Sequence, residues 1–328
     1  MDLKELNYIV TIADEGSISR AADALYMAQS SLSQFLSLYE AELGTTLFVR
    51  TSRGVRPTAS GQAFLNHARQ ILLHYRRAQN ELWDIEDLKG GQIELGTATF
   101  RGTYLLPRVL KRFHEIHPGI HVSVTEQNSV DLEDGILTGM LDIAMIALPA
   151  IKLRENIDWL MQDEIILVAS KDHPVMEFVH EPKTPDFQTD PEPSPVSADS
   201  PFAAPASSIP RPWIRLEDTA PFEFILGPPD TILGMTARRE FKKLGIEPRT
   251  WNAAFTAPFA AAMAREGVAL ALTYSSCIVP DDSAVYLRIG EDGIFLDLAL
   301  VYPSGEYRSK ATRALGRLFH EMYPSRPL

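Results

Sequence analysis

The chain has 328 residues, too many for one compact core and suited to a small domain joined to a larger one, at about 100 to 200 residues per domain. A hydrophobic share of 45% and a charged share of 23% are ordinary for a soluble globular protein, and no apolar run approaches the ~18 residues that a membrane-spanning helix needs. The formal net charge of -12 argues against a protein that coats nucleic acid by bulk electrostatics. Any DNA binding must therefore be local.

The N-terminal stretch and the cysteine content bear on the cellular compartment. The first residues mix acidic side chains into an apolar stretch and contain no small-residue cleavage site, so we expect no secretory signal. The single cysteine, Cys277, excludes an intrachain disulfide and a cysteine-based zinc cluster. Its apolar surroundings favour core packing over a role as a nucleophile. We expect a cytoplasmic protein.

The chain begins with two predicted helices. Apolar residues recur at helical spacing from Leu3 to Ala13, and Gly16 follows where that helix would stop. Ser17 or Ser19 can cap a short second helix, whose small inner alanines permit the close approach of a neighbour.

A third helix has one apolar face and one polar, uncharged face. The apolar stripe consists of Leu32, Phe35, Leu36, Tyr39 and Leu43. The opposite face carries Gln29, Ser30, Ser33, Gln34 and Ser37. Short helices in this order predict a helix-turn-helix whose third helix enters a DNA major groove, and amide and hydroxyl groups suit base edges and phosphates.

Two short strands, at 47–50 and 55–57, surround a turn at Arg53 and Gly54 and predict a wing. Arg50, Arg53 and Arg56 are three of the five basic residues before Thr58. Local positive charge therefore lies where a wing would meet phosphates.

A long helix is predicted from Thr58 to about Leu88. Its apolar residues alternate steps of four and three, which indicates a coiled-coil seam: Phe64, Ala68, Ile71, Tyr75, Ala78, Leu82 and Ile85. A helix of ~30 residues is ~45 Å long, so a small N-terminal domain cannot bury this narrow stripe alone. We expect pairing with a second copy of the chain.

Gly90 and Gly91 end this helix, and strands then alternate with helices, which predicts an α/β domain with a mainly parallel sheet. We assign residues 1–58 to the winged helix-turn-helix, 59–89 to a linker helix and 90–328 to a sensor domain. The sensor would have two lobes, about 92–164 with 274–328 and about 165–273, with chain crossings near residues 165 and 270. Strands at 285–289 and 296–302 and a helix at 309–322 would complete the first lobe.

Residues 181–212 contain nine prolines among small and polar residues, with too few apolar side chains to fold alone. We expect a flexible surface insertion; the alternative is a proline-rich partner motif.

The segment from Leu3 to Leu65 resembles the N-terminal domain of the LysR-type transcriptional regulators. The resemblance rests on residue types at fixed spacing, which are Ala21, Ala22, Leu25, Gln29, Ser33, Leu38, Glu40, Leu43, Gly44, Leu47, Phe48, Arg50, Arg53, Pro57, Thr58 and Gly61. The stretches HPGIHVSV, LDIAMI and DEIILVASKDHP lie where the effector domain of that family would have them, and this domain is similar to type 2 periplasmic binding proteins. The proline-rich insertion is unusual for the family.

The resemblance implies a sequence-specific regulator that binds interrupted, roughly palindromic operators in double-stranded DNA as a dimer or tetramer. A small effector would enter the cleft between the lobes and change the DNA contacts, and an activator of this kind would also contact RNA polymerase. It further implies that Gln29, Ser30 and Ser33 contact bases or phosphates, and that Arg50 and Arg53 contact the DNA backbone; the alternative for the serines is an ordinary helix surface.

The chain departs from the family pattern at two positions of the third helix. Ala28 stands where a capping Ser or Thr is common, and Phe35 stands where a Gln is common. The cap of this helix and part of its polar face are therefore not reproduced.

An effector would bind beyond the carboxyl ends of the strands, where helix N-termini present free N–H groups. These positions are Thr97, Thr99, Phe100, Arg101, Asn128 and Ser129 in the first lobe, and Gly227, Pro228, Thr231, Thr256 and Thr273 in the second. Thr99, Arg101 and Asn128 can hold a carboxylate and Phe100 can cover an apolar body, so an organic or aromatic acid is the expected effector. The alternative is that Thr99 only caps a helix and Arg101 points to solvent.

The sequence disfavours two other functions. An enzyme is disfavoured because the sequence contains no Gly-x-Ser-x-Gly elbow, no P-loop, no His-Glu-x-x-His and no Gly-x-Gly-x-x-Gly motif, and because His114 with His117 would need more ligands to hold a metal. A solute-binding transport protein is disfavoured by the missing export signal and by the wing and linker helix. We expect no catalytic residue, no metal, no cofactor and no membrane partner.

Overall fold

The computed structural model of the protein describes residues 2–52, 54–85, 90–182, 210–229, 231–251, 255–305 and 307–323. The chain divides into two compact units, which are Met1–Gly91 with Thr138–Met140 and Gln92–Leu137 with Leu141–Leu328. We call them the N-terminal unit and the C-terminal unit and describe each by itself. No helix in these described ranges is long and apolar enough to span a membrane.

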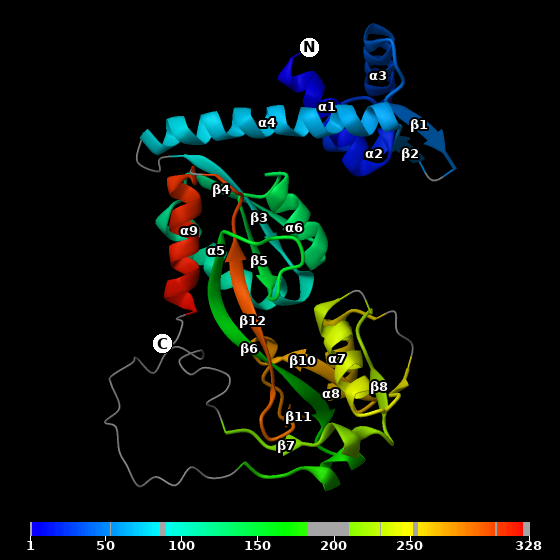
Figure 1. Ribbon diagram of the computed structural model, residues 1–328, viewed down its shortest axis with the longest axis vertical. Coiled ribbons are helices and arrows are strands. Elements are labelled where there is room, and N and C mark those ends of the chain that lie inside the picture. The colour runs from blue at the N-terminus through cyan, green and yellow to red at the C-terminus, as the bar shows by residue number, and fades with distance from the viewer. Residues whose placement is uncertain are drawn as a thin grey trace. The chain divides into compact units, whose positions relative to one another are not determined.

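The N-terminal unit consists of short helices, a two-stranded wing and a long helix (Figure 1). Its elements are α1 (Leu3–Glu15), α2 (Ile18–Ala24), α3 (Gln29–Leu43), β1 (Phe48–Thr51), β2 (Gly54–Pro57) and α4 (Ala59–Ile85). The order and approximate bounds agree with the winged helix-turn-helix and linker helix expected from the sequence.

Capping residues explain where the first helices begin. The Asp2 side chain accepts a hydrogen bond from the Glu5 backbone N–H, and the Glu5 side chain accepts one from the Asp2 N–H, both at 2.8 Å, which forms a capping box. Ser17 accepts from the backbone N–H of Arg20 at 3.4 Å and caps α2. Helix α3 begins after Ala28 without any side-chain cap, as its sequence predicts.

One apolar core joins the helices to the wing. The largest fully buried side chains in it are Leu6, Ile9, Ile12, Leu32, Leu47 and Leu65. Burying a side chain of this size stabilises a fold by about 1.5–3 kcal/mol. Gly61 lets α4 approach the wing closely, because a Cβ there would lie 1.9 Å from the backbone oxygen of Leu47.

The apolar stripe of α4 is buried only at its beginning. Phe64 and Ala68 pack in the core of the N-terminal unit. The later stripe positions are exposed in the single chain, with Leu82 at 65% and Ile85 at 79%. The stripe therefore has an apolar part that the single chain does not bury.

The first lobe of the C-terminal unit alternates strands and helices, as predicted. Its elements are β3 (Gly91–Thr97), α5 (Thr99–Ile116), β4 (Ile120–Glu126), α6 (Ser129–Leu137), β5 (Ile143–Ala147) and, from the end of the chain, α9 (Lys310–Met322). Helix α6 packs on Ala144 and Ile146 of β5 through Leu132 and Ile136. Helix α9 packs against α5, where the Tyr323 hydroxyl donates to the backbone oxygen of Leu105 at 2.9 Å.

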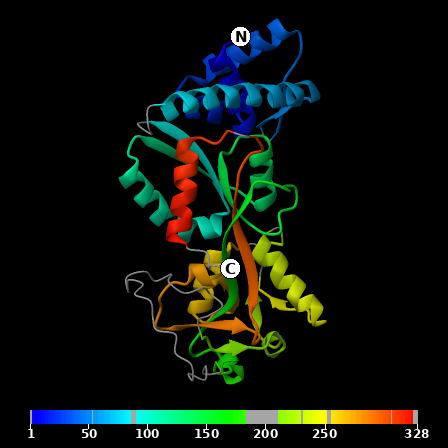
Figure 2. The same cartoon turned by 60° about the vertical axis from the view of Figure 1, so that its left-hand side comes forward.

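Two long strands, β6 (Ile157–Ser170) and β12 (Ile294–Val301), run side by side from the first group of strands to the second (Figures 1 and 2). Strand β6 changes partners at Ile165, which is opposite Ile294 of β12 and opposite Tyr274 of the second lobe. One of the two chain crossings was expected at about this residue. The exact residue ranges of the two lobes stay predictions.

The second lobe completes a single mixed sheet. Its elements are η1 (Pro174–Phe178), β7 (Trp213–Ile214), η3 (Leu216–Thr219), β8 (Glu223–Ile225), α7 (Ile232–Lys243), β9 (Arg249–Thr250), α8 (Ala257–Arg265), β10 (Leu270–Tyr274), η4 (Ser275–Cys277) and β11 (Ala284–Ile289). The strand order is β4-β3-β5-β12-β6-β10-β8-β9. Pairs β3–β5, β8–β10 and β8–β9 are parallel, whereas β6 and β12 run antiparallel to their neighbours. The expected mainly parallel sheet thus occurs only away from the crossing strands.

One further expectation is wrong. Strand β11 was assigned to the first lobe, but it pairs with residues 166–170 of β6 and with β7, so it lies with the second-lobe strands. Residues 252–254, which follow β9, lie outside the described ranges.

His180 and Trp213 form a short neck at the base of the proline-rich insertion. Their backbones exchange two hydrogen bonds, of 2.8 and 2.9 Å, and their rings stack with centroids 4.3 Å apart. Residues 183–209 lie outside the described ranges, so the prediction of a flexible insertion falls almost entirely there. The neck therefore joins the two chain ends that flank that segment by direct contacts.

Candidate functional site

The polar face of α3 is available to a ligand. Gln29, Ser30 and Gln34 are exposed, and Ser33 is partly buried, whereas the opposite face buries Leu32 in the core. The uncharged hydrogen-bonding face expected from the sequence is therefore present at the surface of the N-terminal unit.

The wing places one arginine beside this face and a second one at its exposed surface. Arg50 on β1 and Arg56 on β2 are exposed, and the Nη2 atom of Arg50 lies 3.5 Å from the hydroxyl oxygen of Ser33. Arg53, the third predicted wing arginine, lies outside the described residues. Helix α3 and the wing thus combine amides, hydroxyls and guanidinium groups on one surface, the combination that reads base edges and holds phosphates.

Residues without a predicted role fix the wing against α3. The Glu40 carboxylate accepts hydrogen bonds from the backbone N–H groups of Leu47 at 2.6 Å and Phe48 at 3.0 Å. Gly54 has a φ of 125°, and a Cβ there would lie 2.1 Å from the backbone oxygen of Gly16. Glu40 belongs to the quoted family pattern, but its contact with residues seven and eight positions later has no local sequence signal.

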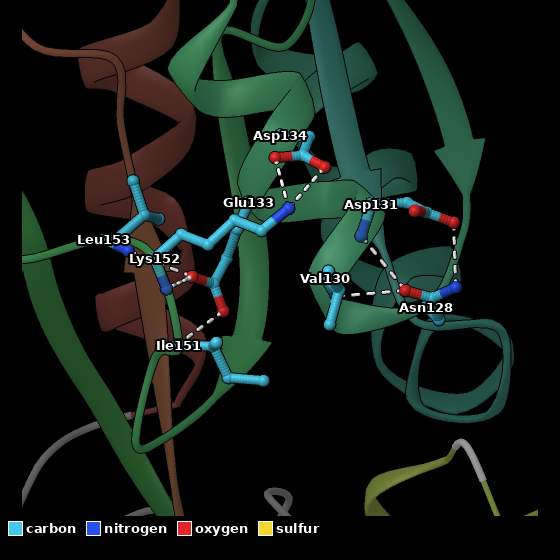
Figure 3. A network of polar contacts seen from close by, with 8 residues as sticks. All are labelled: Asn128, Val130, Asp131, Glu133, Asp134, Ile151, Lys152 and Leu153. Atoms are coloured by element: carbon cyan, nitrogen blue, oxygen red, sulfur yellow. Dashed lines mark hydrogen bonds and ion pairs between the residues drawn. The ribbon is translucent and has the colours of Figure 1, made fainter.

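In the first lobe, the predicted effector residues gather at the starts of α5 and α6. Thr97 is fully buried at the end of β3, and the side chain of Thr99 is not described. Asn128 caps α6, since its Oδ1 accepts from the N–H groups of Val130 and Asp131 at 3.0 Å (Figure 3). Ser129 is the first residue of that helix.

In the second lobe, the predicted residues lie around the start of α7 and the end of β10. The Thr231 hydroxyl accepts from the Gly234 N–H at 3.1 Å and donates to the Pro228 oxygen at 2.7 Å. The Gly227 oxygen accepts from Arg238 at 2.9 Å.

The two remaining threonines differ in their environment. Thr256 precedes α8 without capping it. Thr273 is 1% exposed, and its hydroxyl has no partner among the described residues.

Arg101 does not point to solvent, which corrects one of the two sequence-based alternatives. Only 4% of its side chain is exposed, its Nε lies 3.3 Å from Asp163 Oδ2, and its guanidinium lies 3.7 Å from the ring centre of Tyr274. Asp163 also accepts from the hydroxyls of Ser275 at 2.9 Å and Ser276 at 2.7 Å. Arg101 Nη2 is buried and finds no partner within the described part of the chain.

Burial controls the ionisation of the groups around this ion pair. Burial raises the pKa of Tyr274 to about 12, with Asp163 adding to the effect and Arg101 opposing it. Burial also raises the pKa of the Cys277 thiol to about 12, again with a contribution from Asp163. The thiol therefore stays protonated near neutral pH, which fits core packing better than nucleophilic chemistry.

Two family models together match nearly the whole chain. The model described as bacterial regulatory helix-turn-helix protein, lysR family, matches residues 3–62, and the LysR substrate binding domain model matches residues 86–187 and 196–324. The chain belongs to the LysR family. Among the described residues, no group of three His, Cys, Asp or Glu side chains is arranged to hold a metal ion.

Curated relatives of this LysR-family chain include an HTH-type transcriptional regulator, YcgK, from Bacillus subtilis, 33% identical over 172 residues, which are 52% of this chain and 53% of the relative. Another is a probable RuBisCO transcriptional regulator from Synechocystis, 31% identical over 179 residues, 53% of this chain and 52% of the relative. The nitrogen assimilation regulatory protein nac of Klebsiella aerogenes is 32% identical over 176 residues, 53% of this chain and 57% of the relative. The chain thus spans about half the length of the curated relatives it matches.

Solved structures of low sequence identity share the fold, two of them over nearly the whole chain and one over the regulatory domain. Full-length OxyR from Pseudomonas aeruginosa has a TM-score of 0.59 at 20% identity and covers 98% of this chain and 97% of its own. Full-length CbnR complexed with its target DNA has a TM-score of 0.60 at 20% identity, with 98% and 99% coverage. The regulatory domain of Synechocystis CcmR in complex with 2-PG has a TM-score of 0.55 at 14% identity, with 72% and 99% coverage.

Proposed function

We propose that this LysR-family protein is a sequence-specific, DNA-binding transcriptional regulator that works in the cytoplasm and has no catalytic role. The observation that carries the proposal is the exposed polar face of α3 beside Arg50 of the wing. Residues 1–58 would bind an interrupted palindromic operator, 59–89 would pair two copies, and 90–328 would sense a small molecule. CbnR, which shares the fold, was solved in complex with its target DNA.

Footprinting on the intergenic region upstream of the protein's own gene, with excess competitor DNA at stated salt, tests the DNA part. We expect protection of a site with two-fold symmetry. Arg56→Ala should weaken binding to all sequences and lower the salt slope by about one unit, because it removes a phosphate contact. Gln34→Ala should instead relax the preference for the operator over unrelated DNA.

Lys111, 80% exposed on α5 of the C-terminal unit, gives a control of the same charge, and Lys111→Ala should leave the affinity unchanged. Failure to protect any genomic fragment, or an equal effect of all three substitutions, would contradict the proposal.

We infer self-association from the later part of the α4 stripe, whose apolar residues are exposed in one chain. A second copy would cover them as a dimer or as part of a tetramer. Light scattering on the intact protein tests this: Leu82→Glu should lower the molar mass, whereas the same change at the polar position Gln70 should not. An unchanged mass for Leu82→Glu would exclude this seam.

For the effector, we propose an organic or aromatic acid bound at the strand ends between the two lobes. Its support is the pair of buried groups without partners, Arg101 Nη2 and the Thr273 hydroxyl, together with Phe100, which packs on Tyr274 with ring centres 5.5 Å apart. An unpaired buried polar group costs about 1–3 kcal/mol, and a ligand that pairs with it recovers this energy. The CcmR domain, of the same fold, was solved with 2-PG.

Thr273→Val tests the effector site sharply. Because the hydroxyl has no partner in the described chain, its replacement by a methyl group should not lower the free energy of unfolding. An organic acid found in a thermal-shift screen should, however, bind about tenfold more weakly to the variant. Equal affinity of the acid for the wild type and the variant would show that Thr273 does not belong to the site.

Contact with RNA polymerase is expected only if the protein is an activator.

A further inference from the structure

A cavity of about 630 Å³ lies in the C-terminal unit between the loop after β5, strand β12 and helix α7. Leu148, Leu153 and Phe295 contribute to its apolar wall, and Arg154, Arg239 and Asp297 are its charged lining residues. This volume falls in the range of roughly 300–1,000 Å³ that is typical of small-molecule sites. None of the residues predicted to bind the effector lines it.

The loop wall of the cavity is held in place by a buried carboxylate on α6 (Figure 3). Glu133 is 1% exposed, and it accepts hydrogen bonds from the backbone N–H groups of Ile151 at 2.9 Å, Lys152 at 2.5 Å and Leu153 at 3.0 Å. The Lys152 side chain pairs with both carboxylate oxygens of Asp134 at 2.6 Å. The wall is therefore formed before any ligand arrives, which lowers the ordering cost of binding.

The two arginines that line the cavity retain free donors. The hydrogen bonds of Arg154 use only Nη1, which donates to the backbone oxygens of Leu153 at 3.0 Å and Ala150 at 3.4 Å. Arg239 uses Nε, which donates to Glu240 at 3.0 Å. Within the described residues, Nε and Nη2 of Arg154 and both terminal nitrogens of Arg239 have no partner.

The lining also contains one acidic residue, so its charged side chains, two arginines and one aspartate, leave a net positive charge. Asp297 accepts a hydrogen bond from Trp159 Nε1 at 3.1 Å, and its backbone oxygen accepts from the Leu148 N–H at 2.8 Å. The cavity thus presents two guanidinium groups and one carboxylate that is already hydrogen-bonded, against an apolar wall. Guanidinium groups bind carboxylates and related oxyanions through paired N–H donors.

We propose that this cavity is a second ligand site, which binds a small organic anion with an apolar body. The anionic group pairs with Arg154 and Arg239, and the apolar body packs on the wall near Leu153 and Phe295. Because Arg154 belongs to the loop after β5 and Arg239 to α7, an occupied cavity links the first lobe to the second. This site is separate from the effector site proposed above and does not depend on it.

Isothermal titration calorimetry with 1-naphthoate on the intact protein tests the proposal. We expect 1-naphthoate to bind, its neutral analogue 1-naphthalenemethanol to bind at least about tenfold more weakly, and inorganic phosphate, which has no apolar body, not to compete. Arg154→Gln and Arg239→Gln should each weaken naphthoate binding by about fivefold or more. Arg317→Gln, an exposed arginine of α9, is the matched control and should bind as the wild type does.

A variant that fills the cavity tests whether binding needs the space in the cavity as well as its two arginines. Ala150 lines the cavity, so Ala150→Phe should abolish binding while both arginines remain. Wild-type affinity in Ala150→Phe or in both arginine variants, or no heat of binding at millimolar naphthoate, would overturn the proposal. Loss of binding in Thr273→Val but not in the arginine variants would instead place naphthoate in the effector site, and would overturn this second site alone.

Discussion

Replacing Glu133 by glutamine should destabilise the C-terminal unit more than replacing its exposed neighbour Asp134 by asparagine. The carboxylate of Glu133 is buried and accepts three backbone N–H groups, at 2.5 to 3.0 Å. A hydrogen bond to a charged acceptor contributes about 1.5–3 kcal/mol net. Glutamine keeps one acceptor oxygen, turns a donor towards at least one of the N–H groups and removes the charge from all three. We therefore expect Glu133→Gln to lower the free energy of unfolding by about 2–4 kcal/mol.

Asp134→Asn is the matched control within the same network (Figure 3). Its ion pair with Lys152 has side chains 51% and 37% exposed, and exposed pairs contribute about 0–1 kcal/mol. Urea unfolding followed by far-ultraviolet circular dichroism measures both variants against the wild type. The reasoning would be wrong if Glu133→Gln lowered the free energy of unfolding by less than about 0.5 kcal/mol, or by no more than Asp134→Asn does.

Further predictions concern the core, the wing, pH and the insertion. Asp163→Asn should cost about 3–5 kcal/mol in urea unfolding, because it leaves the buried Arg101 charge unpaired; a loss below 1 kcal/mol would contradict this. Gly61→Ala should weaken operator binding in gel-shift assays, since the added Cβ displaces the start of the wing, and unchanged affinity would contradict it. Burial raises the pKa of Cys277 in the folded protein to about 12, against a usual value of 9.0. The unfolded state therefore loses this proton first, and the free energy of unfolding should fall as the pH rises from about 9 towards 12. Cys277→Ser should reduce that fall. Replacing residues 183–209 by a short Gly-Ser linker should leave the thermal midpoint unchanged within a few degrees, because the neck closes the fold without them.

The elements of the N-terminal unit could be predicted because their signals are local. Helical spacing of apolar residues, Ser17 as a cap, Gly16 as a stop and the missing cap at Ala28 all act within a few positions of the chain. Arg50 could likewise be placed beside the polar face of α3, because the helix and the wing follow each other directly.

The environment of Arg101 could not be predicted from the sequence. Its partner Asp163 is 62 residues away, on β6, so no local pattern links the two residues. The same holds for Glu133, whose backbone partners follow 18 to 20 residues later. Strand β11 was assigned to the wrong lobe for a related reason, since strand neighbours depend on tertiary packing rather than on the pattern within the strand.

The continuity of β6 has a consequence for dissecting the protein. A single strand of 14 residues, ~46 Å long at 3.3 Å per residue, supplies hydrogen bonds to β12 in one half and to β10 and β11 in the other. A cut near Ile165 would leave each fragment with an unpaired strand end and an open apolar core. We therefore expect neither lobe to fold when it is expressed alone, and we expect the two lobes to unfold together in one cooperative transition.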